Sequence, residues 1–189
     1  MPFNRARKQA DPLDEGALHE YAIKALGRRM RTAAELTRLM RAKVEKEASG
    51  QVKIDAVLTR LKEYGYLNDA TYAATYTRLR QENDKLGKRR VQQDLTGKGV
   101  NKELISETLT AAYQNVNEEE LARRHLERKR VKKPANEKEA ARVMRMLLRA
   151  GFSTGVIFRI LEKWDVDDDA LVALEFMDND GPESSNGDR

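Results

Sequence analysis

The sequence contains no cysteine among its 189 residues. A disulfide framework and a thiolate metal site are therefore excluded, and a chain without cysteine suits a reducing cytosol. Long apolar runs are missing too, since the first residues, MPFNRARKQADPLDEG, lack the apolar core of a signal peptide and no segment is long enough to cross a bilayer. We expect a cytoplasmic protein that does not contact membranes.

Patterns typical of β-strands are scarce, because no alternating run of β-branched residues is bounded by turn signals. Helix start signals are frequent instead. Thr32, Asn117 and Asn136 are each followed three residues later by a glutamate, which is the pattern of a capping box. Asp69 is expected to cap a further helix. The sequence thus predicts an all-α protein with about nine helices.

Residues suited to catalysis are few. The two histidines, His19 and His125, fall inside predicted helices, and repeat spacing puts His125 at a core or boundary position rather than in the role of a general base. The TGKG at 96–99 follows an amphipathic helix, whereas a phosphate-binding loop follows a buried strand. The acidic residues are interspersed with lysine and arginine, as on solvated helices. We predict that the protein is not an enzyme and holds no cofactor or metal.

One passage is written twice in the chain. LTGKGVNKELISETL at 95–109 aligns without a gap on LLRAGFSTGVIFRIL at 147–161, and the alignment pairs Gly99 with Gly151. A glycine in this place ends a helix in the left-handed conformation. Asn101 and Ser153 are expected to cap the helix that follows. The duplicated object is therefore a helix, a tight glycine turn and a second helix.

The flanking segments extend this duplication to three copies. Tyr21-Ala22, Tyr72-Ala73 and Leu121-Ala122 occupy equivalent places in units of roughly fifty residues, each with three helices. We predict three tandem three-helix repeats, about nine helices, stacked as an elongated, curved solenoid. The expected divisions are a disordered N-terminal segment at 1–16, repeats at 17–68, 69–116 and 117–164, and an acidic, largely disordered C-terminal tail at 165–189.

Charge is distributed unevenly. Residues 165–189 hold nine acids and one base, a net charge of −8, which leaves +13 for the residues before them in a chain of net charge +5. One interpretation is that the tail keeps a basic protein soluble. The other is that the tail competes with nucleic acid for the basic surface.

The basic residues gather near the starts of the predicted second helices and in the first helix of the third repeat. Helices that follow the glycine turns carry few side chains able to read bases, so we expect the clusters to contact phosphates or an acidic protein surface. For RKRVKK taken alone, a solvated helix end is the alternative interpretation. The predicted binding residues are Arg28, Arg29, Arg31, Lys88, Arg89, Arg90, Arg123, Arg124, Arg128, Lys129, Arg130, Lys132 and Lys133.

Three stretches together resemble the RecX family of bacterial recombination regulators: LGRRMRTAAEL at 26–36, GYLNDATYAATYTRLR at 65–80 and GKRRVQQDLTGKGV at 87–100. The similarity extends through LLRAGFSTGVIFRIL and covers about 17–164. It implies tandem three-helix repeats and binding to RecA, the recombinase that polymerises on single-stranded DNA. It also implies that the protein lies in the groove of that filament and suppresses ATP hydrolysis, strand exchange and co-protease activity.

The resemblance can be carried over residue by residue. The family's R-R-x-x-[ST] passage falls on Arg28, Arg29 and Thr32, and its G-x-x-[RK] passage falls on Gly87 and Arg90. We assign binding to the arginines, because Thr32 and Glu35 are expected to cap a helix and Gly87 to open a turn. The chain has Asn68-Asp69 where the family often has paired aspartates, and the acidic tail lies outside the resemblance.

Two main hypotheses follow. The first is a non-catalytic negative regulator of homologous recombination and the SOS response, a monomer whose partners are the RecA filament and single-stranded DNA, with double-stranded DNA as a further ligand. The second is a sequence-nonspecific DNA-binding protein that acts without a recombinase partner. A weaker third is a helical scaffold whose basic faces are merely solubilising.

Overall fold

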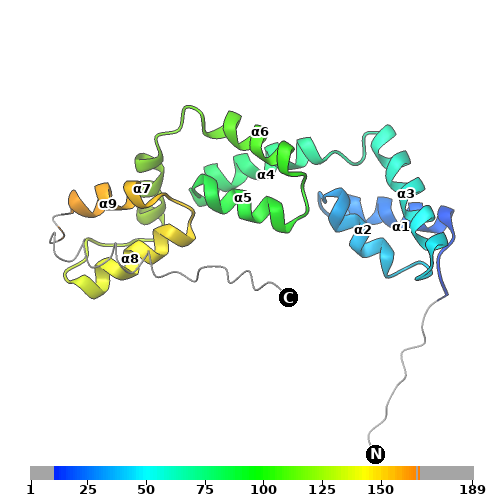
Figure 1. Ribbon diagram of the computed structural model, residues 1–189, viewed down its shortest axis with the longest axis horizontal. Coiled ribbons are helices and arrows are strands. Elements are labelled where there is room, and N and C mark those ends of the chain that lie inside the picture. Colours follow the sequence, from blue (N-terminus) through cyan, green and yellow to red (C-terminus); the bar gives the residue numbers. More distant parts are fainter. Residues whose placement is uncertain (1–10, 165, 167–189) are drawn as a thin grey trace, which may run out of the picture. The chain divides into compact units, whose positions relative to one another are not determined.

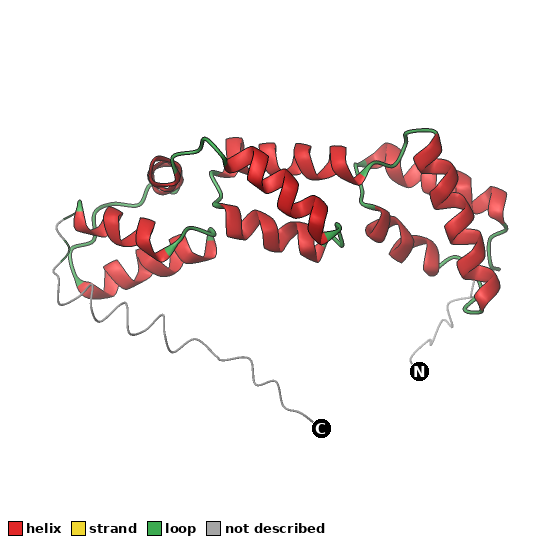
Figure 2. Ribbon diagram, turned by 45° about the horizontal axis from the view of Figure 1, so that its top comes forward, coloured by secondary structure: helices red, strands yellow, loops and turns green. Residues whose placement is uncertain are grey.

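The structure, a computed structural model, describes residues 11–164 and 166, and the predictions for 1–10 and for almost all of the acidic tail lie outside these residues. Nine α-helices and no strand occur in the described part, as predicted (Figures 1 and 2). The helices are α1 (Glu15–Arg28), α2 (Ala33–Arg41), α3 (Ala48–Glu63), α4 (Asp69–Asp84), α5 (Lys88–Gly97), α6 (Lys102–Tyr113), α7 (Glu118–Arg128), α8 (Glu137–Arg149) and α9 (Thr154–Glu162).

The capping residues read from the sequence mostly begin helices. Thr32 forms a complete capping box with Glu35, since its Oγ1 accepts from the Glu35 N–H at 3.0 Å and its own N–H donates to Glu35 Oε2 at 3.3 Å. Asn117 and Asn136 accept from the N–H three residues on, at 3.1 and 3.0 Å. Asn101 accepts at the start of α6 in the same manner. Local hydrogen bonding therefore fixes these helix starts.

Two predicted caps differ from the structure. Asn68, not Asp69, caps α4, because its Oδ1 accepts from the Thr71 N–H at 2.9 Å. Asp69 Oδ1 instead accepts from the N–H of Ala33 at 2.9 Å and so satisfies a free donor at the start of α2. Ser153 precedes α9 but makes no side-chain cap; its Oγ and N–H both bond to the Glu118 carboxylate, at 3.2 and 3.3 Å.

Both glycines of the duplicated passage adopt the left-handed conformation. Gly99 has φ of 74° and Gly151 has φ of 87°, and each ends its helix as predicted. The apolar residue that follows folds back, so that the N–H of Val100 donates to Leu95 O and the N–H of Phe152 donates to Leu147 O, both at 3.2 Å. The TGKG segment is consequently a helix end, which agrees with the prediction.

The described residues form two compact units, one within Met1–Thr75 and Leu95–Thr108, the other within Tyr76–Asp94 and Leu109–Arg189. In the first unit, α1, α2 and α3 contact one another. Their shared core includes Leu18, Leu36 and Ile54, all fully buried. Since apolar burial is the main source of folding energy, these positions specify how the three helices pack.

The second unit has its own core, supplied by α7, α8 and α9. Phe152 and Leu147 are fully buried in it, and α9 contacts both α7 and α8. Trp164, the only tryptophan in the sequence, packs partly buried against this core. Its indole can therefore report the state of the second unit.

Each duplicated turn contacts the start of an earlier helix. Within the first unit, Thr32 Oγ1, before α2, donates to Lys98 O at 2.7 Å. Within the second unit, the N–H of Gly87, before α5, donates to Ala150 O at 2.8 Å. The duplicated turn thus has the same role twice. In each copy, a backbone carbonyl of the turn accepts a hydrogen bond from the residue that precedes an earlier helix. The predicted repeat limits at 17–68, 69–116 and 117–164, and the solenoid built from them, remain predictions.

Candidate partner-binding surface

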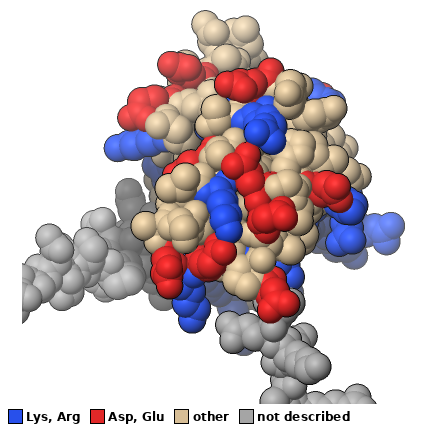
Figure 3. Space-filling model, turned by 90° about the vertical axis from the view of Figure 1, so that its right-hand side faces the viewer, with Lys and Arg blue, Asp and Glu red and all other residues tan. Residues whose placement is uncertain are grey.

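The first predicted arginines lie at the end of α1 in the first unit. Arg28 and Arg29 are exposed, whereas Arg31 is half-buried and donates from Nε to Ala25 O at 3.2 Å. Among the described residues of the face seen in Figure 3, Lys and Arg side chains are interspersed with Asp and Glu, without a large patch of one sign. Because they are exposed, Arg28 and Arg29 are accessible to a partner, whereas Arg31 is hydrogen-bonded to the backbone of α1.

Lys88, Arg89 and Arg90 form the first turn of α5 in the second unit, and all three are exposed. Arg90 Nε donates to Asp94 Oδ1 at 3.0 Å, one helical turn away. Lys88 and Arg89 pair with no acid in the described part of the chain. This helix start therefore presents cations to solvent.

The arginines of α7 are partly neutralised. Arg123 and Arg124 both donate to Glu120 at 2.9 Å, and the hydrogen bond from Arg123 is the main cause that lowers the pKa of the Glu120 carboxyl. Arg128 Nη2 lies 3.2 Å from Asp84 Oδ1. These three side chains consequently hold acids of their own chain, which partly offsets their charge and fixes their orientation.

The residues after α7 surround a hollow of about 450 Å³, here called the basic hollow. Arg130 has φ of 54° and turns the chain away from the end of α7. The cations of the basic hollow are Lys129, Arg130, Lys132, Lys133 and Arg142. Its remaining walls are Val131, Pro134, Glu139, Val143 and Met146. The segment that the sequence marked as basic is therefore a concave surface and not only a helix end.

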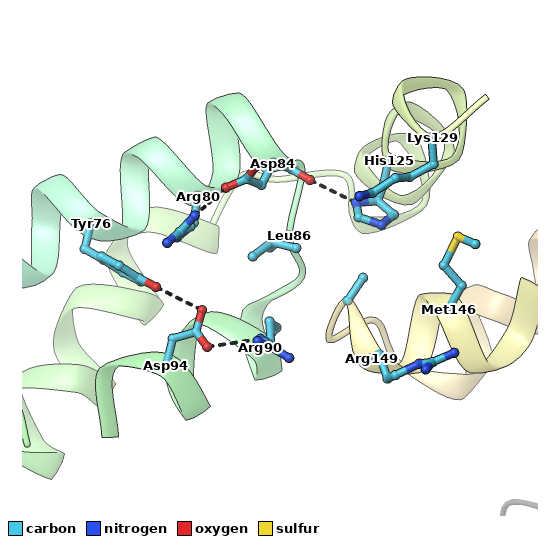
Figure 4. Close-up of a pocket in the computed structure, with 11 residues that line it drawn as sticks. Tyr76, Arg80, Asp84, Leu86, Arg90, Asp94, His125, Lys129, Met146 and Arg149 are labelled. Carbon is cyan, nitrogen blue, oxygen red and sulfur yellow. Dashed lines mark hydrogen bonds and ion pairs between the residues drawn. The ribbon is translucent and has the colours of Figure 1, made fainter. Parts of the chain in front are cut away.

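A neighbouring cleft of about 440 Å³, here called the cationic cleft, lies between α4, α5, α7 and α8 of the second unit (Figure 4). Its cations come from four places in the sequence: Arg80, Arg90, Lys129 and Arg149. Lys129 and Met146 line both the cationic cleft and the basic hollow. The fold thus gathers cations from two predicted repeats around adjoining cavities.

Two aspartates orient the arginines of the cationic cleft. Asp84 Oδ2 accepts from Arg80 Nη1 at 2.7 Å, and Asp94 Oδ1 accepts from Arg90 Nε at 3.0 Å. Tyr76 OH donates to the second oxygen of Asp94 at 3.0 Å. Each aspartate leaves guanidinium N–H groups of its arginine directed elsewhere, and such prearranged donors suit phosphate or carboxylate oxygens.

Arg80 also lies over the ring of Tyr76, with its guanidinium carbon 4.8 Å from the ring centroid. The hydrogen bond to Asp84 is the main cause that raises the pKa of Arg80, and burial raises the pKa of Tyr76. The arginine therefore keeps its charge and the phenol its proton at any ordinary pH. Stacking and ion pairing together restrict Arg80 to one orientation.

His125 lines the cationic cleft and is 5% exposed, so the predicted core or boundary position is confirmed. Its Nδ1 is 2.9 Å from Asp84 O, and since a carbonyl can only accept, Nδ1 carries the proton. The ring packs edge-on against Phe152 with centroids 6.0 Å apart. Burial lowers the pKa of the imidazole below its usual range, so the ring is neutral at neutral pH.

Three cations of these cavities were not among the predicted binding residues: Arg80, Arg142 and Arg149. The spacing of Arg142, Arg145 and Arg149 places them on one face of α8, and this pattern could have identified them. Arg80 stands four residues after Tyr76, as Lys129 stands four residues after His125, and the structure brings all four to one cleft. Recurrent spacing across repeats was therefore an available signal for the cleft.

Among the described residues, no group of three or more His, Asp or Glu side chains is placed to hold a metal ion. None of the described helices has the length and apolar character needed to span a membrane.

Solved structures share this fold of three-helix domains. A crystal structure of regulatory protein RecX superposes with a TM-score of 0.64 over 79% of this chain and 71% of that chain, at 21% sequence identity. A crystal structure of RecX from Lactobacillus salivarius superposes with a TM-score of 0.63 over 80% of this chain and 96% of that chain, at 19% identity. The class of protein is thus an all-helical one with the fold of these two RecX structures.

Sequence comparison gives the family. The profile of the second three-helix domain of RecX matches residues 68–109, and that of the third three-helix domain matches residues 117–161. The chain is 34% identical over 148 residues to regulatory protein RecX of Leptothrix cholodnii, covering 78% of this chain and 89% of that protein. It is 31% identical over 144 residues to regulatory protein RecX of Thermobifida fusca, covering 75% of each. The chain belongs to the RecX family of regulatory proteins.

Family membership confirms the resemblance read from the sequence and the expectation of a regulator rather than an enzyme. RecX proteins are modulators of the RecA recombinase. The assignment of individual basic residues to a partner remains a prediction, because family membership does not identify contacts.

Proposed function

We propose that this protein is a negative regulator of homologous recombination and the SOS response in the cytoplasm, where it binds the RecA filament on single-stranded DNA. In this proposal it inhibits the ATPase, strand-exchange and co-protease activities of the filament. It acts as a monomer and without catalysis of its own.

The observation that carries the proposal is the pair of adjoining cavities in the second unit. Lys129 and Arg149 make no ion pair with any described residue, while Arg80 and Arg90 are held in place by aspartates. Such a set of cations can accept anionic groups with little loss of side-chain entropy, because two of the four are already ordered. An acidic protein surface bound alongside DNA phosphates fits this chemistry.

The inhibitory mechanism rests on several weak contacts along one polymer. Arg28 and Arg29 belong to the first unit and the cationic cleft to the second, so one chain offers more than one contact. Linked contacts bind far more tightly to a repetitive partner than to a single subunit. A regulator that bridges neighbouring recombinase subunits would oppose the rearrangements that ATP turnover and strand exchange require.

The experiment is the ATPase rate of the cognate recombinase on single-stranded DNA, with the protein titrated below one copy per recombinase subunit. Inhibition is expected at these low ratios. The double substitution Lys129→Glu and Arg149→Glu is expected to raise the concentration for half-inhibition by roughly tenfold or more, because charge reversal replaces attraction with repulsion.

A matched control reverses two charges outside the cavities. Lys62→Glu and Arg60→Glu change α3, which supplies no wall to either cavity. The control is expected to inhibit like the unchanged protein. Equal inhibition by the cleft variant would contradict the cleft as the contact surface, and loss of inhibition in both variants would indicate a nonspecific charge effect.

The second candidate is a sequence-nonspecific DNA-binding protein, favoured by the suitability of the same cations for phosphates. Such a protein would inhibit the recombinase ATPase only when it is abundant enough to cover the DNA. Binding to naked single-stranded DNA should then fall about a thousandfold or more between 50 and 200 mM salt if six or more phosphates are contacted.

A further inference from the structure

Repeat register identifies a third position equivalent to the two helix starts that receive a turn. Leu36 and Met40 of α2 correspond to Val91 and Leu95 of α5 and, by the alignment of Leu95 with Leu147, to Val143 and Leu147 of α8; all six are buried. Four residues before the first of each pair stand Thr32 and Gly87, which directly precede α2 and α5, and Glu139, which lies in the first turn of α8. Thr32 and Gly87 bond to Lys98 and Ala150 of a following turn.

Glu139 instead lines the basic hollow. This third position is therefore lined by five cations and one acid, and no glycine turn of the described residues covers it. Four of the cations, Lys129, Arg130, Lys132 and Arg142, form no ion pair within the described residues. An occupant must then be strongly anionic, with apolar groups for the walls made by Val131, Val143 and Met146.

We propose that the acidic tail, residues 165–189, occupies the basic hollow of its own chain. The tail has nine acids and one base. An apolar stretch, ALVALEF at 170–176, lies between two acidic runs. The acidic runs complement the cations of the hollow, and the apolar stretch suits its apolar walls. The inference stands independently of the proposed function.

The tail is long enough to reach. Its residues after Val166 span up to about 75 Å when extended, whereas α8 is about 20 Å long. The tether raises the local concentration of the tail to the millimolar range, so weak ionic contacts suffice to hold it there. Because Lys129 also lines the cationic cleft, a bound tail competes with DNA phosphates for the same cations.

The contact can be measured on the full chain without any recombinase. The absence of cysteine allows a single nitroxide at Ala173→Cys, or separately at Ser185→Cys. At about 50 mM salt, amide signals of 130–133 and 139–143 are expected to lose half or more of their intensity, while those of α1–α3 keep theirs. Lys132→Glu with Arg142→Glu should restore the signals. Unchanged signals near the basic hollow, or equal broadening at Arg28 and Arg29, would overturn the proposal.

A mixed sample separates the chain's own tail from that of a second copy. Nitroxide-bearing protein without isotope label is added to isotope-labelled protein without nitroxide, and no broadening is expected. Broadening in this sample comparable to that in the doubly labelled chain would show that the hollow takes another molecule's tail, and the intrachain proposal would be wrong.

The competition has its own measurement, affinity for a thirty-nucleotide oligo-dT. We expect binding to tighten about tenfold at low salt in the triple variant Asp167→Asn, Asp168→Asn and Asp169→Asn. The weakened tail leaves the cations open, so the DNA phosphates no longer have to displace it. The control makes the same charge change elsewhere, with Glu82→Gln, Glu103→Gln and Glu107→Gln on α4 and α6. If the control variant bound oligo-dT equally tightly, the gain in affinity would come from net charge alone, and a bound tail would be contradicted.

Discussion

Gly87 and Gly151 lie backbone against backbone in the second unit. A Cβ on Gly87 would collide with the carbonyl of Gly151, and a Cβ on Gly151 would collide with the peptide nitrogen of Arg90. The start of α5 and the turn between α8 and α9 are close because neither glycine has a side chain. A substitution at either glycine is therefore expected to lower the free energy of unfolding by more than backbone strain alone would.

Gly151→Ala should lower the free energy of unfolding of the second unit by about 3 kcal/mol or more, as left-handed strain and collision with fixed backbone add together. Trp164 fluorescence in a urea titration follows this unit. The control is Gly65→Ala, where φ is 73° but a Cβ would meet nothing within 4 Å. It should cost only about 1 kcal/mol, followed by circular dichroism. Similar losses in the two variants would contradict the backbone contact.

Thr32 is fully buried and makes two side-chain hydrogen bonds, one accepted from Glu35 N–H and one donated to Lys98 O. Thr32→Val keeps the shape but leaves both partners unsatisfied, so the first unit should lose about 2 to 4 kcal/mol. Thr32→Ser keeps the hydroxyl and should lose about 1 kcal/mol or less. Circular dichroism in urea compares the two, and equal losses would mean that the methyl group matters more than the hydroxyl.

His125 should make the stability of the second unit depend on pH. Its folded pKa lies below the ordinary value of about 6.5, so the unfolded chain binds the proton more readily in the interval between them. The stabilisation is thus complete above about pH 6.5 and declines as pH falls toward the folded pKa. Urea titrations followed by Trp164 should show a slope between pH 7 and 5 that His125→Gln removes. An unchanged slope in that variant would assign the effect to another group.

The cationic cleft should contribute to the salt dependence of binding to single-stranded DNA. If Arg149 contacts one phosphate, Arg149→Gln lowers the slope of log affinity against log salt by about 0.7. Arg60→Gln on α3 is the control, because Arg60 pairs with Glu15 in the first unit. A slope that stays the same for Arg149→Gln would remove this side chain from the phosphate contacts.

The sequence was sufficient for features that depend on neighbouring residues. The capping box of Thr32, the caps of Asn101, Asn117 and Asn136, and the turn at Gly151 each need only groups a few positions away. Such short-range hydrogen bonds form in the same way wherever the helix is placed, so their residue patterns are readable without a structure.

Features that depend on distant partners could not be read. Asp69 bonds to Ala33, and Ser153 bonds to Glu118, across 36 and 35 positions of sequence. Either side chain could cap its own helix as well, and only the packing of helices decides between the two. The cationic cleft is likewise assembled by packing. Arg90 and Lys129 of its lining were among the predicted binding residues, whereas Arg80 and Arg149 were not, although their spacing in the sequence offered a signal.

The contact between Gly87 and Ala150 also bears on how such a chain can evolve. It joins an N–H to a carbonyl, groups that every residue other than proline possesses, and it requires only that nothing be added at the glycines. Substitutions on the surrounding faces leave this bond in place. The surface around α5 and α8 can therefore change in charge and shape while the start of α5 stays attached to the turn before α9.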